Sequence, residues 1–326
     1  MIELLDEKTI AFGPVPSRRL GRSLGINNIP PKICSYSCVY CQLGKTSKLT
    51  VDRQAFYKPE DVVRHVKSKV AEVTARNERV DYLTFVSDGE PTLDINIINE
   101  ITPLKQTGIP IAVITNASLL WREDVKEALL EADFVSLKVD AVSEGLWRRI
   151  NRPHNRLRLS MVLKGIQKFV KEFKGTVVSE TMLIKGIDYG NEFERIAELL
   201  SELKKLDKAY IAIPTRPPAE KWVKPAKEEV ANVAFQIFSQ NLGVNRVEYL
   251  MGYEGNAFAF TGNVEEDLLS IMAVHPMRKE GVKRLLRKAN ADWQIIKKLL
   301  CEGKLVELEY RGKKYYMRKL PSKTVS

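Results

Sequence analysis

Residues 33–46 read ICSYSCVYCQLGKT and place thiols at Cys34, Cys38 and Cys41. Spacings of four and three residues allow one short loop to direct all three sulfurs at one centre. Thiolates are soft ligands that select iron–sulfur clusters, zinc or Cu(I). The only other cysteine, Cys301, lies far along the sequence, so an obvious fourth thiolate is missing. A cluster held by three protein ligands leaves one iron open to bind another molecule.

An iron–sulfur cluster is the favoured interpretation of this loop, and two alternatives stay open. One is zinc completed by a histidine, and the other is a disulfide. The three histidines are expected to be structural or on the surface: His65, His154 and His275. Cys301 falls on a predicted amphipathic helix, where we expect it in the core.

The composition indicates a globular protein with a large and a small domain. The chain has 326 residues, of which 44% are hydrophobic and 29% charged. No apolar run reaches the length of about 18 residues that spans a bilayer. The first ten residues, MIELLDEKTI, carry acids where a signal peptide has basic residues. We therefore expect a cytoplasmic protein.

Short β-branched runs alternate with charged amphipathic stretches, which is typical of repeated βα units. A helix is predicted over residues 59–77. Six strands are predicted at residues 23–29, 80–86, 111–115, 134–139, 176–183 and 209–213. Strands joined by helices run parallel, so the fold class is α/β, with a doubly wound sheet or a full or partial barrel.

The pattern changes near Gly262. Three short helices are predicted at residues 264–273, 279–289 and 292–301, and strands at 305–310 and 314–318 alternate around Arg311-Gly312-Lys313, a hairpin signal. This order is typical of a winged helix. Two stripes are expected in its core: Val282, Leu285 and Leu286, and Trp293, Ile296, Leu299 and Leu300.

Positive charge gathers in the same region. The whole chain carries +11, and residues 277–319 contribute 14 Lys or Arg against 5 Asp or Glu, which is +9. Such a surface attracts polyanions without specificity. Cations expected to face outward, toward phosphates, are Arg284, Arg287, Lys288, Lys297, Lys298, Lys313 and Lys314. Nucleic-acid binding is favoured slightly over protein contacts.

The CxxxCxxC motif, with Tyr40 before its last cysteine, resembles the cluster loop of the radical S-adenosylmethionine (SAM) superfamily. The resemblance covers roughly residues 10–235. It implies a partial (β/α)6 TIM-like barrel and a [4Fe-4S] cluster whose fourth iron binds SAM. Reductive cleavage of SAM would give a 5'-deoxyadenosyl radical that abstracts hydrogen from a substrate. The domains expected are a radical SAM core with an N-terminal extension over 1–261 and a winged-helix-like basic domain over 262–326.

The turn at residues 87–91, Ser-Asp-Gly-Glu-Pro, follows a predicted strand. In the family this place holds a Gly-Gly-Glu motif that meets the amino group of the methionine moiety. Asp88 replaces the first glycine, while Gly89 and Glu90 match the motif. A carboxylate or carbonyl oxygen suits a cationic ammonium. Asn116 ends the next predicted strand, where its amide is suited to a ribose or carboxylate.

Strand alternation in DFVSLKVDA puts Ser136, Lys138 and Asp140 on one face, which indicates a cavity lined by polar groups. A similar strand in activating enzymes of the superfamily contacts the ribose and carboxylate of SAM. Tyr40 and these three residues complete the cofactor-binding candidates. Further candidates for substrate contacts, or for ordinary ion pairs and caps, are Arg152, Glu180, Thr215 and Arg216. Candidates for binding a carboxylate or stabilising the anionic cluster, or for a solvated basic loop, are Arg18, Arg19 and Arg22.

Within the superfamily, the turn and the segment GPVPSRRLGRSLG resemble iron–sulfur oxidoreductases related to the wyosine tRNA synthetases. Those tRNA enzymes use additional N-terminal cysteines, and none precedes Cys34 here. Three functions compete: a radical enzyme acting on RNA, one acting on a protein or small molecule, including a glycyl-radical partner, and a nonenzymatic metal-stapled nucleic-acid-binding regulator. The two enzyme hypotheses imply an electron donor such as a ferredoxin or flavodoxin and no membrane partner.

Overall fold

A curved sheet of eight strands forms the body of this computed structural model, which describes residues 10–252, 255 and 258–319. Its strand order is β1-β2-β5-β6-β7-β8-β9-β10. Strand β1 pairs antiparallel with β2, and every other neighbouring pair is parallel. The strands are β1 Ala11–Ser17, β2 Gly21–Ile26, β5 Tyr82–Phe85, β6 Ile111–Thr115, β7 Phe134–Lys138, β8 Thr176–Met182, β9 Leu206–Ala212 and β10 Val247–Leu250.

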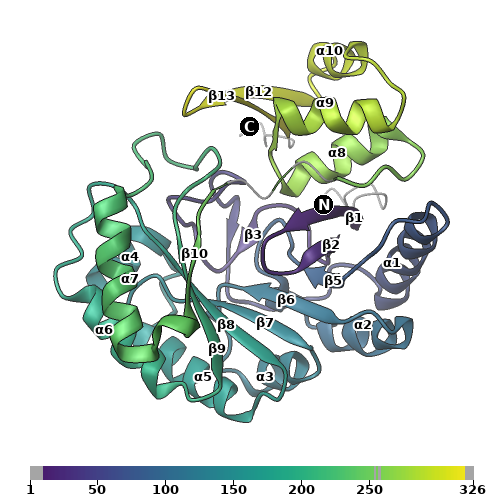
Figure 1. Ribbon diagram of the computed structural model, residues 1–326. Helices are drawn as coiled ribbons and strands as arrows, with labels where there is room; N and C mark the ends of the chain where they lie inside the picture. Colours follow the sequence, from purple (N-terminus) through teal and green to yellow (C-terminus); the bar gives the residue numbers. More distant parts are fainter. Residues whose placement is uncertain (1–9, 253–254, 256–257, 320–326) are drawn as a thin grey trace.

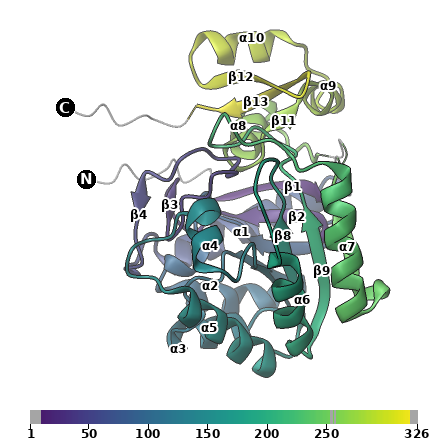
Figure 2. The same ribbon diagram turned by 90° about the vertical axis from the view of Figure 1, so that its left-hand side faces the viewer.

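Helices cover the outer face of this sheet (Figures 1 and 2). A parallel strand needs a crossover connection to reach its neighbour, and helices supply these crossovers. They are α1 Pro59–Thr74, α2 Ile97–Leu104, α3 Glu123–Leu130, α4 Glu144–Asn151, α5 Leu159–Glu172, α6 Glu192–Glu202 and α7 Glu228–Leu242. Helix α1 has Pro59 at its start and acids in its first turn, as the helix dipole favours.

The sheet is a largely parallel α/β sheet of the partial-barrel kind. The six predicted strands are confirmed as β2 and β5 to β9, while β1 and β10 add one strand at each edge. Among the described residues no pairing joins β1 to β10, so the barrel stays open between its edges. Arg18, in the turn after β1, donates from Nη2 to the carbonyl oxygen of Leu250 at the end of β10, at 2.8 Å.

The turn between β1 and β2 fills one end of the barrel. Leu20 is buried there against Ala112, Phe134 and Val178. Phe134 is the first residue of β7, so this contact marks the amino ends of the strands. The opposite end, where the strands finish, is where parallel α/β folds build their sites.

A second set of elements follows β10. It consists of α8 Val264–Val274, β11 Met277–Arg278, α9 Lys279–Lys288, α10 Gln294–Cys301, β12 Leu305–Tyr310 and β13 Lys313–Arg318, with sheet order β11-β13-β12. The three predicted helices and the hairpin are confirmed. Arg311 and Gly312 form the hairpin loop with φ of 53° and 67°, the left-handed conformation that a two-residue loop requires.

This C-terminal region packs on β1, above the barrel in Figure 1. One hydrophobic cluster joins Leu285, Ile296 and Tyr316 to Phe12 and Val15 of β1. The predicted core stripes lie in or against this cluster. The expectation that Cys301 is buried was wrong: it is exposed at the last residue of α10. The boundary at residues 261–262 stays a prediction.

Candidate active site

The cysteine loop lies against the turns that follow β5 and β6. Cys34 ends the two-residue strand β3, Ile33–Cys34, which pairs parallel with β4, Lys48–Leu49. The amide of Cys41 donates to the carbonyl oxygen of Cys38 at 3.1 Å and closes a tight turn. All three thiols are partly buried. Short backbone pairings therefore fix both ends of the loop.

Nitrogen donors from three elements point at the sulfurs. The Cys34 Sγ accepts from the Tyr36 amide and from Asn116 Nδ2, both at 3.5 Å. The Cys38 Sγ accepts from Asn151 Nδ2 at 3.6 Å. Hydrogen bonds to ligand sulfurs are one of the ways in which proteins set the reduction potential of an iron–sulfur cluster.

Burial raises the pKa of each cysteine thiol. For Cys34 the negative charge of Glu90 adds to the effect of burial. For Cys38, burial and then Asp140 raise the pKa to about 12. A bound metal reverses this preference, because a coordinating thiol is deprotonated. Among the described residues, no group of three or more His, Cys, Asp or Glu side chains is gathered closely enough to hold a single metal ion.

Gly89 brings the turn after β5 into contact with the cysteine loop. A β carbon on Gly89 would lie 1.9 Å from the carbonyl oxygen of Ile33, so no other residue fits there without a shift of the backbone. The same carbonyl accepts from the Glu90 amide at 3.1 Å, and Lys32 donates from its amide to the Asp88 carbonyl at 2.6 Å. The turn and the strand that carries Cys34 are thus one backbone-bonded unit.

The Glu90 carboxylate is buried and holds this end of the barrel together. It accepts from the Thr92 amide at 3.2 Å and from the Thr92 hydroxyl at 2.6 Å. It also accepts from the Thr115 hydroxyl at 2.6 Å and from the Asn116 amide at 2.7 Å. Four donors from the chain therefore surround this carboxylate, and they connect the ends of β5 and β6.

Asp88 is buried with one carboxylate oxygen paired and the other not. Oδ2 accepts from Asn27 Nδ2 at 3.3 Å, while Oδ1 has no hydrogen-bond partner in the part of the chain that the structure describes. Burial raises the pKa of Asp88 to about 7, and Arg318 and Lys32 oppose the rise. A buried acceptor without a donor is costly, so this oxygen is suited to a cationic ligand.

The predicted polar face of β7 is confirmed and carries a partly buried ion-pair network. Glu180 of β8 accepts from Arg19 at 2.7 Å and pairs with Lys138. Arg19 also donates to the Ser136 hydroxyl at 2.8 Å. The two cations lower the pKa of Glu180 to about 2. Lys138 lies 5.3 Å from the ring centroid of Tyr40, which links the network to the cysteine loop.

Asp140 connects β7 to the cysteine loop. Its Oδ2 accepts from the Tyr40 hydroxyl and from Asn151 Nδ2, the latter at 2.6 Å. Its Oδ1 accepts from the Met182 amide at 2.8 Å. Both oxygens are therefore used within the chain, and Asp140 fixes the position of Tyr40.

The remaining sequence candidates bond to other residues of the chain rather than to the thiols. Arg152 is exposed and pairs with Glu220 at 2.5 Å, and Arg22 pairs with Glu78. Arg216, after β9, donates to Gln42 beside Cys41 at 2.7 Å. It also reaches the ring of the buried His275 in the C-terminal region, at 3.1 Å from Nε2. The Thr215 carbonyl oxygen accepts from Tyr315 at 2.9 Å.

A family comparison matches residues 28–200, which contain the cysteine loop and the strands from β5 to β8, to the Radical SAM superfamily. The chain belongs to this superfamily. It is 51% identical over 316 residues to the UPF0026 protein MJ1312 of Methanocaldococcus jannaschii, which covers 97% of this chain and 98% of that protein. The predicted family membership is confirmed.

Two solved structures share the fold. A structure of TYW1 with a lysine-pyruvate adduct bound aligns with a TM-score of 0.50 at 15% identity, over 68% of this chain and 74% of that one. A radical SAM methyltransferase from Sphaerobacter thermophilus aligns with a TM-score of 0.52 at 16% identity, over 72% and 69%. At these identities the likeness concerns the fold of the radical SAM barrel.

As a radical SAM enzyme, this protein uses a [4Fe-4S] cluster and SAM. The residues present fit the cluster, because three thiols share one loop, nitrogen donors contact two of the sulfurs, and the fourth cysteine, Cys301, is elsewhere. In the described part of the chain no helix is long and apolar enough to cross a membrane.

The contacts of two residues in this radical SAM site were not predicted from the sequence. Asn151 donates to Asp140 and to the Cys38 sulfur. The signal was a polar residue on the buried face of α4, beside Trp147 and Ile150. The sequence offers Arg19 for binding a carboxylate, for stabilising the cluster or for a basic loop. In the structure it enters the barrel from the hairpin between β1 and β2 and pairs with the Glu180 carboxylate.

Proposed function

We propose that Cys34, Cys38 and Cys41 bind three irons of the [4Fe-4S] cluster and that SAM binds beside them at the carboxyl end of the barrel. The supporting observation is the backbone unit that joins Cys34 to the turn at residues 87–91. When bound, the reduced cluster and SAM supply a 5'-deoxyadenosyl radical that abstracts hydrogen from the substrate.

In this proposal the turn receives the ammonium group of SAM. Asp88 Oδ1 is the acceptor there that lacks a partner among the described residues, whereas the four donors around Glu90 give that residue a positioning role. Gly89 permits the close approach of the two backbones. Asn116 orients its amide toward Cys34 and Ser35 and so lies at the edge of the same site.

The polar face of β7 is proposed to bind the rest of SAM. Lys138 offers a cation for the carboxylate, and Ser136 offers a hydroxyl for the ribose. The ion pairs of Glu180 hold both side chains in place. Tyr40 and Asp140 maintain the position of the cysteine loop, since their side chains are bonded to each other.

For the substrate we propose RNA. The C-terminal region has the element order of a winged helix, α8-β11-α9-α10-β12-β13, and carries most of the excess positive charge. It contacts the barrel next to the cysteine loop: Tyr310 and Tyr315 donate to the carbonyl oxygens of Pro214 and Thr215. The neighbouring Arg216 bonds to Gln42. A polyanion held by this region would lie close to the open barrel.

A protein or small-molecule substrate is the second candidate, because the barrel fold alone serves many chemistries. The nonenzymatic regulator is set aside, since the chain belongs to a family of enzymes. An electron donor of the ferredoxin or flavodoxin type and a cytoplasmic location stay predictions.

Deuterium transfer tests the substrate class directly. Cells would be grown on deuterated medium, and their extract would be separated into RNA, protein and small-molecule fractions. Each fraction would be added to the reduced enzyme with unlabelled SAM. The proposal predicts deuterium in 5'-deoxyadenosine with the RNA fraction. Transfer from the protein or small-molecule fraction alone would overturn the RNA assignment and leave the radical chemistry intact.

A further inference from the structure

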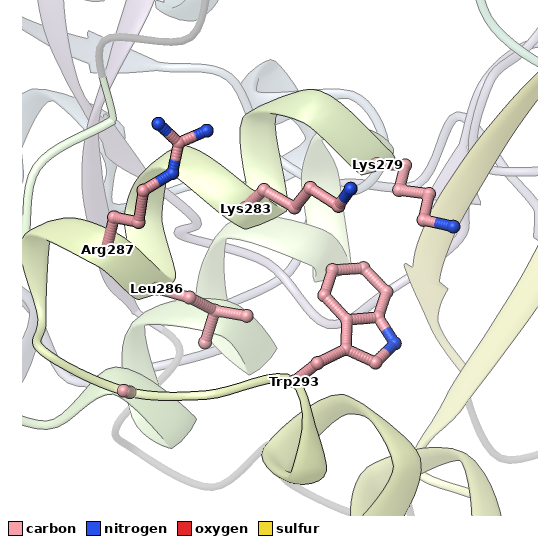
Figure 3. A pocket seen from close by; sticks show the side chains of 6 residues that line it. Lys279, Lys283, Leu286, Arg287 and Trp293 are labelled. Atoms are coloured by element: carbon pink, nitrogen blue, oxygen red, sulfur yellow. The ribbon is translucent and has the colours of Figure 1, made fainter.

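Helix α9 presents three cations in a row above a shallow hollow (Figure 3). Lys279, Lys283 and Arg287 follow one another at intervals of four residues, which places them on one face of the helix. Leu286, Ala291 and Trp293 complete the lining. The hollow measures about 310 Å³, which lies at the small end of the volumes of ligand sites, roughly 300–1,000 Å³. We call these six residues the α9 groove.

Ion pairs neutralise three lysines near the α9 groove, whereas two cations of the groove itself have no such pair. Lys288, Lys298 and Lys314, which the sequence marked as phosphate contacts, are each paired with an acid: Glu78, Glu265 and Glu307 respectively. Lys283 and Arg287 are exposed and form no ion pair within the described residues. Arg284, Lys297 and Lys313 also form no ion pair within the described residues, so the unpaired charge extends beyond the groove, and the aromatic ring of Trp293 distinguishes the groove from the rest of it.

Trp293 adds an aromatic surface to this charge. Its ring is held edge-on by Tyr316, with centroids 5.6 Å apart and planes at 77°. Lys279 Nζ lies 5.6 Å from the Trp293 ring centroid, at a distance typical of a cation–π contact. The charge of Lys279 lowers the pKa of Glu307, but less than the hydrogen bonds from Lys314 and Tyr316 do. A positioned ring beside a row of cations is the pairing that binds unpaired bases and their phosphates.

We propose that the α9 groove binds single-stranded RNA, with one unpaired base stacked at Trp293 and adjoining phosphates at Lys279, Lys283 and Arg287. The inference rests on the proposed RNA substrate and deepens it. Stacking needs the face of a base, and a duplex keeps its base faces covered. The groove thus favours an unpaired segment over duplex RNA or DNA.

The α9 groove is a capture site, separate from the residues that surround the thiols. Its loss is therefore expected to raise the KM for the RNA substrate and leave uncoupled SAM cleavage unchanged.

The test measures binding of a fluorescein-labelled single-stranded 12-mer of uridine to the full-length protein by anisotropy at several salt concentrations. The double variant Lys283→Glu with Arg287→Glu should bind at least about tenfold more weakly. Neutral replacements of the same two residues should reduce the slope of log affinity against log salt by about 1.4, which corresponds to two phosphate contacts on a single strand. The matched control is Lys164→Glu with Lys168→Glu, an exposed pair at the same spacing on α5, and it should bind like the unchanged protein.

A second variant tests the stacking. Trp293→Leu keeps an apolar side chain in the C-terminal core and removes the ring, and it should weaken binding about 5- to 150-fold, the range of base–aromatic stacking. Thermal melting would verify that Trp293→Leu folds. The charge variants replace exposed side chains, so their result does not depend on the folding of Trp293→Leu.

The possible outcomes distinguish a wrong groove assignment from a wrong substrate class. If both groove variants bind RNA as the unchanged protein does, the groove assignment is wrong while the RNA proposal survives. If the unchanged protein binds no RNA even at low salt, both proposals fail. Equal affinity for a duplex of the same length overturns the stacked base. Preference for polyglutamate over RNA overturns the inference in favour of an acidic protein partner.

Discussion

Gly89 lies directly against the backbone of Ile33, and a β carbon on Gly89 would approach the Ile33 carbonyl oxygen to 1.9 Å. Ile33 precedes the first cysteine of the loop. A substitution at Gly89 must therefore displace either the turn after β5 or the strand that carries Cys34. Backbone is the obstacle on both sides, so the conflict cannot be relieved by a change of side-chain rotamer.

We expect Gly89→Ala to lower the iron and sulfide content of the reconstituted protein severalfold. Iron and sulfide per chain, measured after anaerobic reconstitution, provide the test. Gly145→Ala is the matched control, because a β carbon there meets no described residue within 4 Å and the position is helical. A Gly89→Ala protein with full cluster content would show that the two backbones are not as closely joined as described.

Glu180→Gln should destabilise the cluster-free protein by about 3–5 kcal/mol at pH 7, because it leaves the largely buried side chains of Arg19 and Lys138, which are 12% and 20% exposed, without this partner. The pKa of Glu180 is lowered to about 2 in the fold. Its contribution is therefore complete above the ordinary carboxyl pKa of about 4.3 and is lost as the pH falls toward 2.

Denaturant unfolding at pH 7 and pH 3 would measure this effect, and the difference between the two proteins should shrink at pH 3. Glu198→Gln, at an exposed position of α6, is the control and should change stability by less than about 0.5 kcal/mol. Equal stability of Glu180→Gln and the unchanged protein at pH 7 would contradict the buried network.

Asp88→Asn should stabilise the cluster-free protein at pH 8 and weaken its binding of SAM after reconstitution. Burial raises the pKa of Asp88 to about 7, so its ionisation opposes folding. Because the folded pKa is the higher one, this penalty is absent below about pH 4, grows up to pH 7 and is constant above it, reaching at most about 4 kcal/mol.

Unfolding curves of the Asp88 variant at pH 4 and pH 8, together with SAM binding by equilibrium dialysis, separate the two effects. A stable variant with unchanged SAM affinity would refute the proposed role of Oδ1. A variant that is no more stable at pH 8 would refute the raised pKa.

Much of the barrel was predictable from the sequence because its signals are local. Alternation in β7 placed Ser136 and Lys138 on the face opposite Val135 and Leu137, as the structure has them. Strand β1 was missed, because its glycine and two prolines are residues that strands disfavour, although the antiparallel edge position tolerates them.

The contacts within the site depend on long-range packing that no periodicity reveals. Arg19 reaches Glu180, which is 161 positions away in the chain, and Arg216 reaches Gln42 across 174 positions. Cys301 was expected in the core on helical spacing, yet the helix ends at this residue and leaves it exposed.

Asn151→Ala should lower the reduction potential of the cluster, because it removes the donor to the Cys38 sulfur. A hydrogen bond to sulfur stabilises the more negative reduced state, and about 1 kcal/mol of difference between the two states corresponds to about 40 mV for one electron. A redox titration followed by electron paramagnetic resonance would show the shift. An unchanged or higher potential at full iron content would contradict the contact.

If Cys34, Cys38 and Cys41 hold the cluster that cleaves SAM, release of 5'-deoxyadenosine must depend on all three thiols. The reconstituted protein, reduced with dithionite and supplied with SAM, is measured beside single Cys→Ala variants of these positions and beside Cys301→Ala, whose thiol is exposed and outside the loop. We expect release from the unchanged protein and from Cys301→Ala, and none from the three loop variants. Release that persists in any loop variant, or that disappears in Cys301→Ala, would contradict the claim that these three thiols hold the cluster.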